Sequence, residues 1–202
     1  SKVLHPRAVE YAANSGVTLR VLSSFIEGQG TLITFEDANM ERPVVSGIAH
    51  AIDEAKLTVV GVPDVPGVAS TILGPIAGAS IEVDMIVQNI GSDGTTDFTF
   101  TVKRRDYDTA KGILDGIIKD IGARDVIGDN AIVKVSVVGV GMRSHAGVAT
   151  RMFDALAAED INIQMISTSE IKISVVIAEQ YLDVAVRSIH KVFDLGNNVT
   201  VA

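Results

Sequence analysis

The chain contains no cysteine, so disulfide bonds, thiolate metal sites and cysteine nucleophiles are excluded. Aromatic residues are scarce as well, at 4% of the 202 residues, with no tryptophan. No apolar stretch reaches the roughly 18 residues that a membrane-spanning helix needs, and the first residues lack the charged-then-apolar layout of a signal peptide. These absences predict a cytoplasmic protein that makes no membrane contact.

Basic charge is also in short supply. The formal net charge is −8 and the isoelectric point is about 4.9, so the chain repels phosphate backbones. The one basic run, residues 103–105, is not interleaved with aromatic residues and is typical of a solvated strand end. We therefore expect no nucleic-acid partner.

Apolar residues are abundant, at 47% of the chain with a mean hydropathy of +0.34. Most of them are Val, Ile, Leu and Ala, a composition that favours sheets covered by helices. Part of this apolar surface is expected to close a subunit interface, so a homodimer is the predicted assembly.

An internal repeat organises most of the sequence. GVAST at 67–71 recurs as GVATR at 147–151, and IEVDMI at 81–86 recurs as INIQMI at 161–166, both 80 residues later. In each copy a β-branched run precedes a Gly-containing loop, a helix, two strands and a second helix. This order is the ferredoxin-like βαββαβ unit. The predicted fold class is α+β, with two tandem units whose antiparallel sheets are covered by helices.

The predicted domains are a first unit at 57–129 and a second at 130–202, with an N-terminal segment at 1–56 that packs on them. Within that segment, a helix from Pro6 to Asn14 is expected to end at Gly16, a common left-handed residue after a helix. The closing strand of the first unit is expected near Ala123. For the second unit, either the strand beginning at Val17 or the one beginning at Val199 could close the sheet.

Apolar periodicity defines the predicted core. The leading helices present inward-facing residues at helical spacing: Val68, Ile72 and Ile76 in the first copy, and Val148, Met152 and Leu156 in the second. In the strand TTDFTFTV, Phe98, Phe100 and Val102 take the core side. The alternate residues Asp97, Thr99 and Thr101 take the other face, where they can hydrogen-bond across strands or line a pocket.

The loop Asp64–Gly67 is a candidate site for a zwitterion. Unpaired N–H groups at a helix start attract a carboxylate, Gly67 permits close approach, and Asp64 can hold an ammonium group. The alternative is an ordinary helix start capped by the Asp side chain. The second copy has Arg143 to Ala146 before its glycine, with neither the Asp nor the Pro, so the two copies should not bind ligand equivalently.

Polar residues on the strand that begins at Ile81 form a second cluster. With a period of two, Glu82, Asp84 and Gln88 lie on one face, opposite Val83, Met85 and Val87. They could select the side chain of a ligand, or they could simply face solvent.

Catalytic and metal signals are weak. Gly139 to Gly141 follows a strand, as in a dinucleotide-binding turn, but the third glycine is missing, so a nucleotide-dependent transferase is only an alternative hypothesis. The four histidines lack metal-ligand spacing. We therefore predict no catalytic residues, no metal and no cofactor; a purely structural assembly module is a third hypothesis.

Five segments carry a resemblance to a known family: GVPDVPGVA, IEVDMIVQN, DGTTDFTFTV, VGVGMRSHAGVA and INIQMISTSEIKISVV. Together they resemble the paired ACT domains of bacterial aspartate kinase (aspartokinase). LHPRAVEYA and RVLSSF are similar to the end of its kinase domain. The resemblance implies a regulatory β subunit, or the regulatory region of the enzyme, that lacks the kinase core. Such a chain is not an enzyme alone but a partner of the aspartate kinase catalytic subunit or domain.

The family resemblance also implies feedback inhibition by L-threonine, L-lysine or both, bound where ACT units meet. The effector contacts that it implies are Asp64, Val65, Pro66, Gly67, Val68, Ala69, Glu82, Val83, Asp84, Gln88, Val148, Ala149, Asn162, Ile163, Thr168 and Ser169.

Overall fold

A computed structural model describes residues 4–34, 45–91, 93–140, 142 and 147–195. The chain divides into two compact units, residues 1–42 and 43–202.

The smaller unit contains α1 (Pro6–Asn14), β1 (Leu19–Val21) and β2 (Thr31–Ile33). The helix has the predicted bounds, and Gly16 follows it with φ +68°. The strand predicted from Val17 pairs with β2 in a two-stranded sheet. It therefore does not close the second repeat, and that alternative is wrong.

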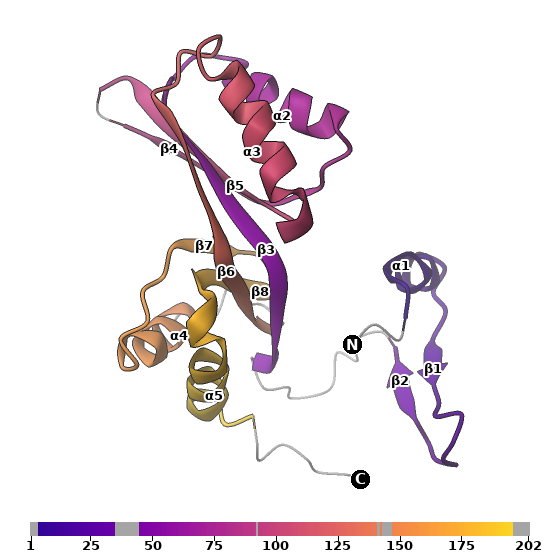
Figure 1. Cartoon of the computed structure of the whole chain (residues 1–202). Helices are drawn as coiled ribbons and strands as arrows, with labels where there is room; N and C mark the ends of the chain where they lie inside the picture. The colour runs from indigo at the N-terminus through magenta and orange to yellow at the C-terminus, as the bar shows by residue number, and fades with distance from the viewer. Residues whose placement is uncertain (1–3, 35–44, 92, 141, 143–146, 196–202) are drawn as a thin grey trace. The chain divides into compact units, whose positions relative to one another are not determined.

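The larger unit is built on one six-stranded antiparallel sheet in the order β4-β5-β3-β6-β8-β7 (Figure 1). Its strands are β3 (Val45–Pro63), β4 (Val83–Ile90), β5 (Thr95–Val102), β6 (Asp125–Gly139), β7 (Met165–Thr168) and β8 (Lys172–Ala178). Its helices are α2 (Val68–Gly78), α3 (Tyr107–Ile117), α4 (Val148–Ala157) and α5 (Leu182–Val192), with 3₁₀ turns at Arg104–Asp106 and Glu179–Tyr181.

The two repeats share the long central strands β3 and β6. The second part of β3, from Ala55, pairs with β5 and with the start of β6, where Val59 lies opposite Val126. The first part of β3 pairs with the end of β6, where Ile48 lies opposite Val137. Each repeat thus has the ferredoxin-like strand order, and each takes its closing strand from an extension of the other repeat's first strand.

The closing strand of the second repeat is therefore residues 45–51, which the sequence prediction placed in the N-terminal segment. β3 is 19 residues long, so one strand serves both repeats, and the predicted division at residue 56 lies within it. The other alternative, the strand at Val199, lies outside the described residues.

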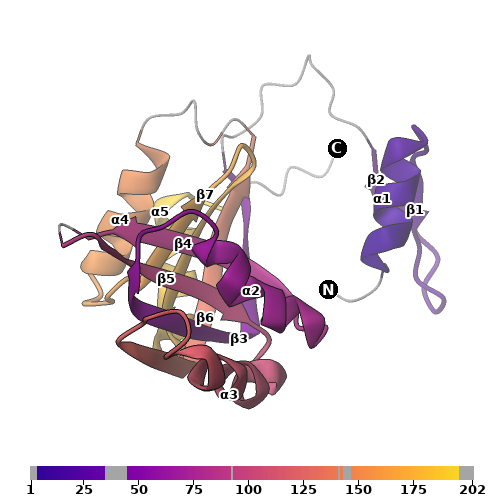
Figure 2. The same ribbon diagram turned by 90° about the horizontal axis from the view of Figure 1, so that it is seen from above.

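Helices cover each half of the sheet (Figure 2). α2 and α3 pack on the first repeat around Leu57 and Phe100, and α4 and α5 pack on the second around Val135 and Val175. The predicted inward positions are confirmed as buried: Val68, Ile72, Ile76, Phe98, Phe100, Val102, Val148, Met152 and Leu156.

The helix-free faces of the two halves meet in a third cluster of Met85, Ile132, Met165 and Val176. The register of β3 against β6 shifts between Ala51 and Lys56, and such irregularities bend a strand. The bend lets β4 and β7, the two outermost strands, contribute to one apolar cluster.

The predicted alternation along β4 is partly wrong. Val83 packs in the helix-side core, whereas Met85 and Val87 pack in the helix-free cluster. The pairing of β4 with β5 shifts register between Val83 and Ile86, which breaks the period of two. Asp84 and Gln88 consequently lie on different faces, because Gln88 pairs with Phe98, a residue of the helix-side core.

The leading helices of both repeats end in the same way. Ser80 and Asp160 adopt left-handed φ values of 58° and 55°, and the next residue's N–H donates back to the helix, as from Ile161 to the Leu156 carbonyl at 3.0 Å. Glycine is the residue that favours this position. Gly122 occupies the corresponding place after α3, with φ +67°.

We expect Asp160→Gly to raise the free energy of unfolding by up to about 1 kcal/mol, because a side chain is strained in the left-handed region. Urea denaturation measures this change. Gly122→Asp is the matched reverse variant and should lower the free energy of unfolding. Equal stability of both variants and the parent chain would contradict the view that a side chain is strained at these left-handed positions.

Candidate functional site

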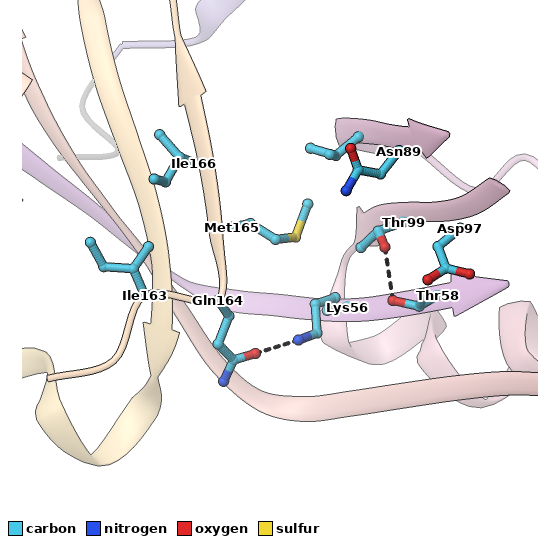
Figure 3. A pocket seen from close by; sticks show the side chains of 10 residues that line it. Lys56, Thr58, Asn89, Asp97, Thr99, Ile163, Gln164, Met165 and Ile166 are labelled. Carbon is cyan, nitrogen blue, oxygen red and sulfur yellow. Dashed lines mark hydrogen bonds between the residues drawn. The ribbon is translucent and has the colours of Figure 1, made fainter. Parts of the chain in front are cut away.

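A hollow of about 440 Å³ lies between the helix-free face of the first repeat and the β7 edge of the second (Figure 3). The first repeat contributes side chains from β3, β4 and β5, and the second contributes residues 163–166. The lining residues are Lys56, Thr58, Val87, Asn89, Asp97, Thr99, Ile163, Gln164, Met165 and Ile166. We call this hollow the inter-repeat cleft.

Polar contacts cross the cleft. The Lys56 ammonium donates a hydrogen bond to the Gln164 side-chain oxygen, and Gln164 Nε2 donates to Asp129 Oδ2 at 3.4 Å. On the wall formed by the first repeat, Thr58 and Thr99 share a hydrogen bond of 2.9 Å. The cleft is thus held by side chains from both repeats.

Asp97 lies at the other end of the cleft and is fixed by backbone. Its Oδ1 accepts a hydrogen bond from the Gly61 N–H at 2.8 Å. Gly61 has φ +65°, where a side chain is strained, and a Cβ there would have to displace the end of the Arg124 side chain, so this position favours glycine. Of the three residues predicted to hydrogen-bond across strands or line a pocket, Asp97 and Thr99 line the cleft, whereas the Thr101 hydroxyl accepts from the Met85 N–H at 3.1 Å. Lys56 and Gln164 were not predicted as site residues.

A buried ion cluster lies where β3 bends. Glu54 is 1% exposed, and its Oε1 accepts from Lys103 Nζ at 3.2 Å and from Lys134 Nζ at 3.5 Å. Lys134 also pairs with Asp84. Glu54 Oε2 has no hydrogen-bond partner among the residues that the structure describes. Residues of β3, β4 and β6 and the residue after β5 therefore form one ion cluster, in which Glu54 contacts both lysines and Asp84 contacts Lys134.

A second hollow, of about 510 Å³, lies beside this ion cluster. Three of the predicted effector contacts, Glu82, Val83 and Asp84, line it together with Glu54 and Lys134. Glu54 follows Asp53 within the same strand, and nothing in the sequence singles it out or pairs it with lysines 49 and 80 residues away.

The predicted loop Asp64–Gly67 is exposed and leads into α2. Gly67 is the N-cap residue, with φ 95°, and no side chain caps the helix, so the alternative of an Asp-capped start is wrong. Gly147 has almost the same conformation before α4, with φ 97° and again no side-chain cap. Neither helix start has a side-chain cap among the described residues; at α2 the Val68 N–H donates to the Val65 carbonyl at 3.3 Å, which leaves the next N–H groups of the first turn as donors for an outside acceptor.

The β4–β5 turn lies beside this loop, since the Asp64 N–H donates to the Gly94 carbonyl at 3.1 Å. Hydrogen bonds from the Thr95 hydroxyl and N–H, at 2.7 and 3.1 Å, lower the pKa of Asp93 from its usual value. The turn thus keeps a negative charge beside the loop at neutral pH.

One chain does not gather the predicted effector contacts into one pocket. Pro63 pairs with Thr95 at one end of the first repeat, while Ala55 and Val83 both pair with Val102 at the other. Eight residues of strand separate these ends by about 26 Å. The Asp64 loop is therefore remote from Glu82, Val83 and Asp84.

The remaining predicted contacts are equally scattered. Gln88 is exposed on β4, Val148 is buried and Ala149 partly buried at the start of α4, and Asn162 is exposed. Ile163 lines the inter-repeat cleft. Thr168 ends β7, and the N–H of Ser169 donates to the Lys172 carbonyl at 2.8 Å.

The candidate nucleotide turn belongs to the sheet. Gly139 is the last residue of β6, and its N–H donates to the Ile171 carbonyl at 2.9 Å; Gly141 lies outside the described residues. Within the described part of the chain, no group of three or more His, Cys, Asp or Glu residues could hold a metal ion. No helix in those same ranges is long and apolar enough to cross a membrane.

Comparison with known families identifies both repeats. The ACT domain family matches residues 56–118, and a second ACT domain model matches residues 135–193. The ferredoxin-like order of both repeats agrees with these matches. The chain therefore carries two ACT domains.

Relatives and solved structures identify the family more narrowly. An aspartate kinase of Pseudomonas fluorescens is 67% identical over 196 residues, 96% of this chain and 48% of the relative. A crystal structure of aspartokinase alpha and beta subunits has 56% identity and a TM-score of 0.71, covering 75% of this chain and 99% of the matched chain. The regulatory subunit of aspartate kinase from Thermus thermophilus has 38% identity and a TM-score of 0.70, covering 74% and 99%.

The chain belongs to the aspartokinase family and corresponds to its regulatory ACT region. It spans about half the length of the curated relatives that it matches.

We expect Glu54→Ala to lower the free energy of unfolding by about 2–3 kcal/mol, because it leaves two lysines beside an apolar core without their shared acid. This expected loss of stability is smaller than for a fully buried ion pair, since the Lys103 side chain is 34% exposed. Chemical denaturation measures the change. Glu159→Ala, at an exposed position, is the control and should change stability by less than about 0.5 kcal/mol; equal small effects of both variants would show that the ion cluster is not structural.

Proposed function

We propose that the chain is the feedback-regulatory region of an aspartate kinase and binds L-threonine, L-lysine or both where ACT domains of two copies meet. The kinase catalytic subunit or domain, which phosphorylates aspartate with ATP, is its functional partner. The observation that carries this proposal is the open helix start at Gly67, with the carboxylate of Asp64 beside it.

The chemistry of this helix start suits a free amino acid. The N–H groups at the start of α2 have no side-chain cap and carry a partial positive charge, so they favour an α-carboxylate. Asp64 is exposed three residues earlier and can receive the α-ammonium group. A zwitterion satisfies both charges at once.

The separation of the predicted contacts supports a site completed by a second copy. Within one chain, about 26 Å of strand lies between the Asp64 loop and Val83. β4 and β7 are the edge strands of the sheet, so another copy can pair alongside them. A two-fold dimer of this kind would bring the loop of one protomer to the strand residues of its partner.

The shared strands supply a route for regulation. An effector that favours one arrangement of the first ACT domain also acts on the second, because β3 and β6 belong to both. Coupling free energies of about 1–3 kcal/mol are typical of allosteric proteins. A shift in the arrangement of the ACT domains would in this way inhibit the catalytic partner.

Calorimetry on the whole chain tests the proposal with threonine, lysine, methionine and isoleucine. We expect heat of binding from threonine, lysine or both, and none from the other two. Absence of heat from all four amino acids would favour a purely structural module instead.

Asp64→Ala should weaken effector binding about tenfold, since it removes a charge-assisted hydrogen bond, and should leave the melting temperature almost unchanged because the side chain is exposed. Asp108→Ala, at an exposed acid in the same ACT domain, is the matched control and should bind normally. Parallel losses of affinity and melting temperature in Asp64→Ala would contradict the assigned role.

A further inference from the structure

We propose that the inter-repeat cleft is a second ligand site, which takes an elongated small molecule with a carboxylate at one end and an ammonium group at the other. The cleft is separate from the Asp64 loop. It needs no second copy of the chain, because both of its walls belong to one protomer. The proposal therefore does not depend on the effector site described above.

Lys56 provides the anion-binding end. Its ammonium is partly buried and donates to a neutral amide, that of Gln164. Its cross-strand neighbour Asp129 is engaged elsewhere, by the Ala131 N–H at 2.9 Å and by Gln164 at 3.4 Å. Lys56 forms no ion pair within 4 Å with any carboxylate in the described ranges. A ligand carboxylate would provide a charge-assisted bond in place of the amide.

Asp97 provides the cation-binding end. Its Oδ1 is held by the Gly61 N–H at 2.8 Å, which fixes the carboxylate at the cleft wall. No hydrogen bond from another described residue reaches Oδ2. That oxygen can accept from a ligand ammonium without loss of the backbone contact.

The spacing of these charges selects the shape of the ligand. Thr58 lies opposite Thr99, with Lys56 two residues away in one direction and Asp97 two residues away in the other. Their backbone positions are thus about 13 Å apart along the sheet. The α-carboxylate and α-ammonium groups of an amino acid are too close together to reach both ends, so threonine cannot bridge the cleft, whereas lysine could do so only through its terminal ε-ammonium. A flexible chain with a charge at each end can reach both, and its apolar middle would lie against Met165 (Figure 3) and Val87, which also lines the cleft.

A ligand in the cleft would touch both ACT domains. Thr58 and Asp97 belong to the first domain, and Gln164 and Met165 belong to the second. Binding would stabilise the bent arrangement of the sheet, because it adds contacts that exist only when the two helix-free faces meet.

Calorimetry with ε-aminocaproate tests the proposal, because this molecule has terminal charges of both signs and no α-ammonium group. We expect it to bind the whole chain, whereas caproate and hexylamine, which each lack one charge, should bind at least about tenfold more weakly. No binding of ε-aminocaproate at millimolar concentration, or equal binding of the singly charged compounds, would overturn the proposal.

Variants locate the site. Lys56→Met and Asp97→Asn should each weaken ε-aminocaproate binding about tenfold, and Asp97→Asn keeps an oxygen for the Gly61 N–H. Lys172→Met, at an exposed lysine on β8, is the control and should bind as the parent chain does. Unchanged affinity in both cleft variants would overturn the assignment. Threonine has no terminal ammonium and therefore reports on the effector site alone: threonine binding without ε-aminocaproate binding would refute the cleft, and ε-aminocaproate binding without threonine binding would support the cleft and count against threonine as the effector.

Discussion

The structure depends on the exchange of strands between two ACT domains. β3 and β6 are each long enough to begin one domain and close the other. The second domain has only three strands without residues 45–51 of β3, and the first domain's closing strand is the start of β6, so the apolar faces of both are buried by a common sheet. The bend at Glu54 then turns the two helix-free faces toward each other. The inter-repeat cleft and the ion cluster at Glu54 are positioned by this shared sheet.

The same constraint explains why a regulatory function suits this fold. In a protein with two independent domains, ligand binding to one need not affect the other. Here the strand that carries Ile48 in one core also carries Leu57 in the other, so a shift in one domain moves backbone in both. An allosteric signal requires a structural element whose conformational equilibrium is shifted by ligand binding at either site. The shared strands are such an element.

The sequence predicted what local patterns determine. Apolar spacing located the buried faces of α2 and α4, and the repeat predicted two ferredoxin-like units. Prediction from the sequence was wrong where pairing between distant segments determines the structure. Residues 45–51 contain Gly47 and His50 and carry little of a core strand's pattern, yet pairing with β6 makes them one. The contact between Lys56 and Gln164, 108 residues apart, arises only from the bend, so no spacing in the sequence could reveal it.

Native-state hydrogen exchange tests the exchange of strands most directly. Leu156→Ala creates a cavity in the second domain and should cost about 2–5 kcal/mol. If the domains form one cooperative unit, the slowest amides of β5 in the first domain should exchange faster by the same factor as those of β8 in the second. Acceleration confined to β7 and β8, with β5 unchanged, would contradict the account.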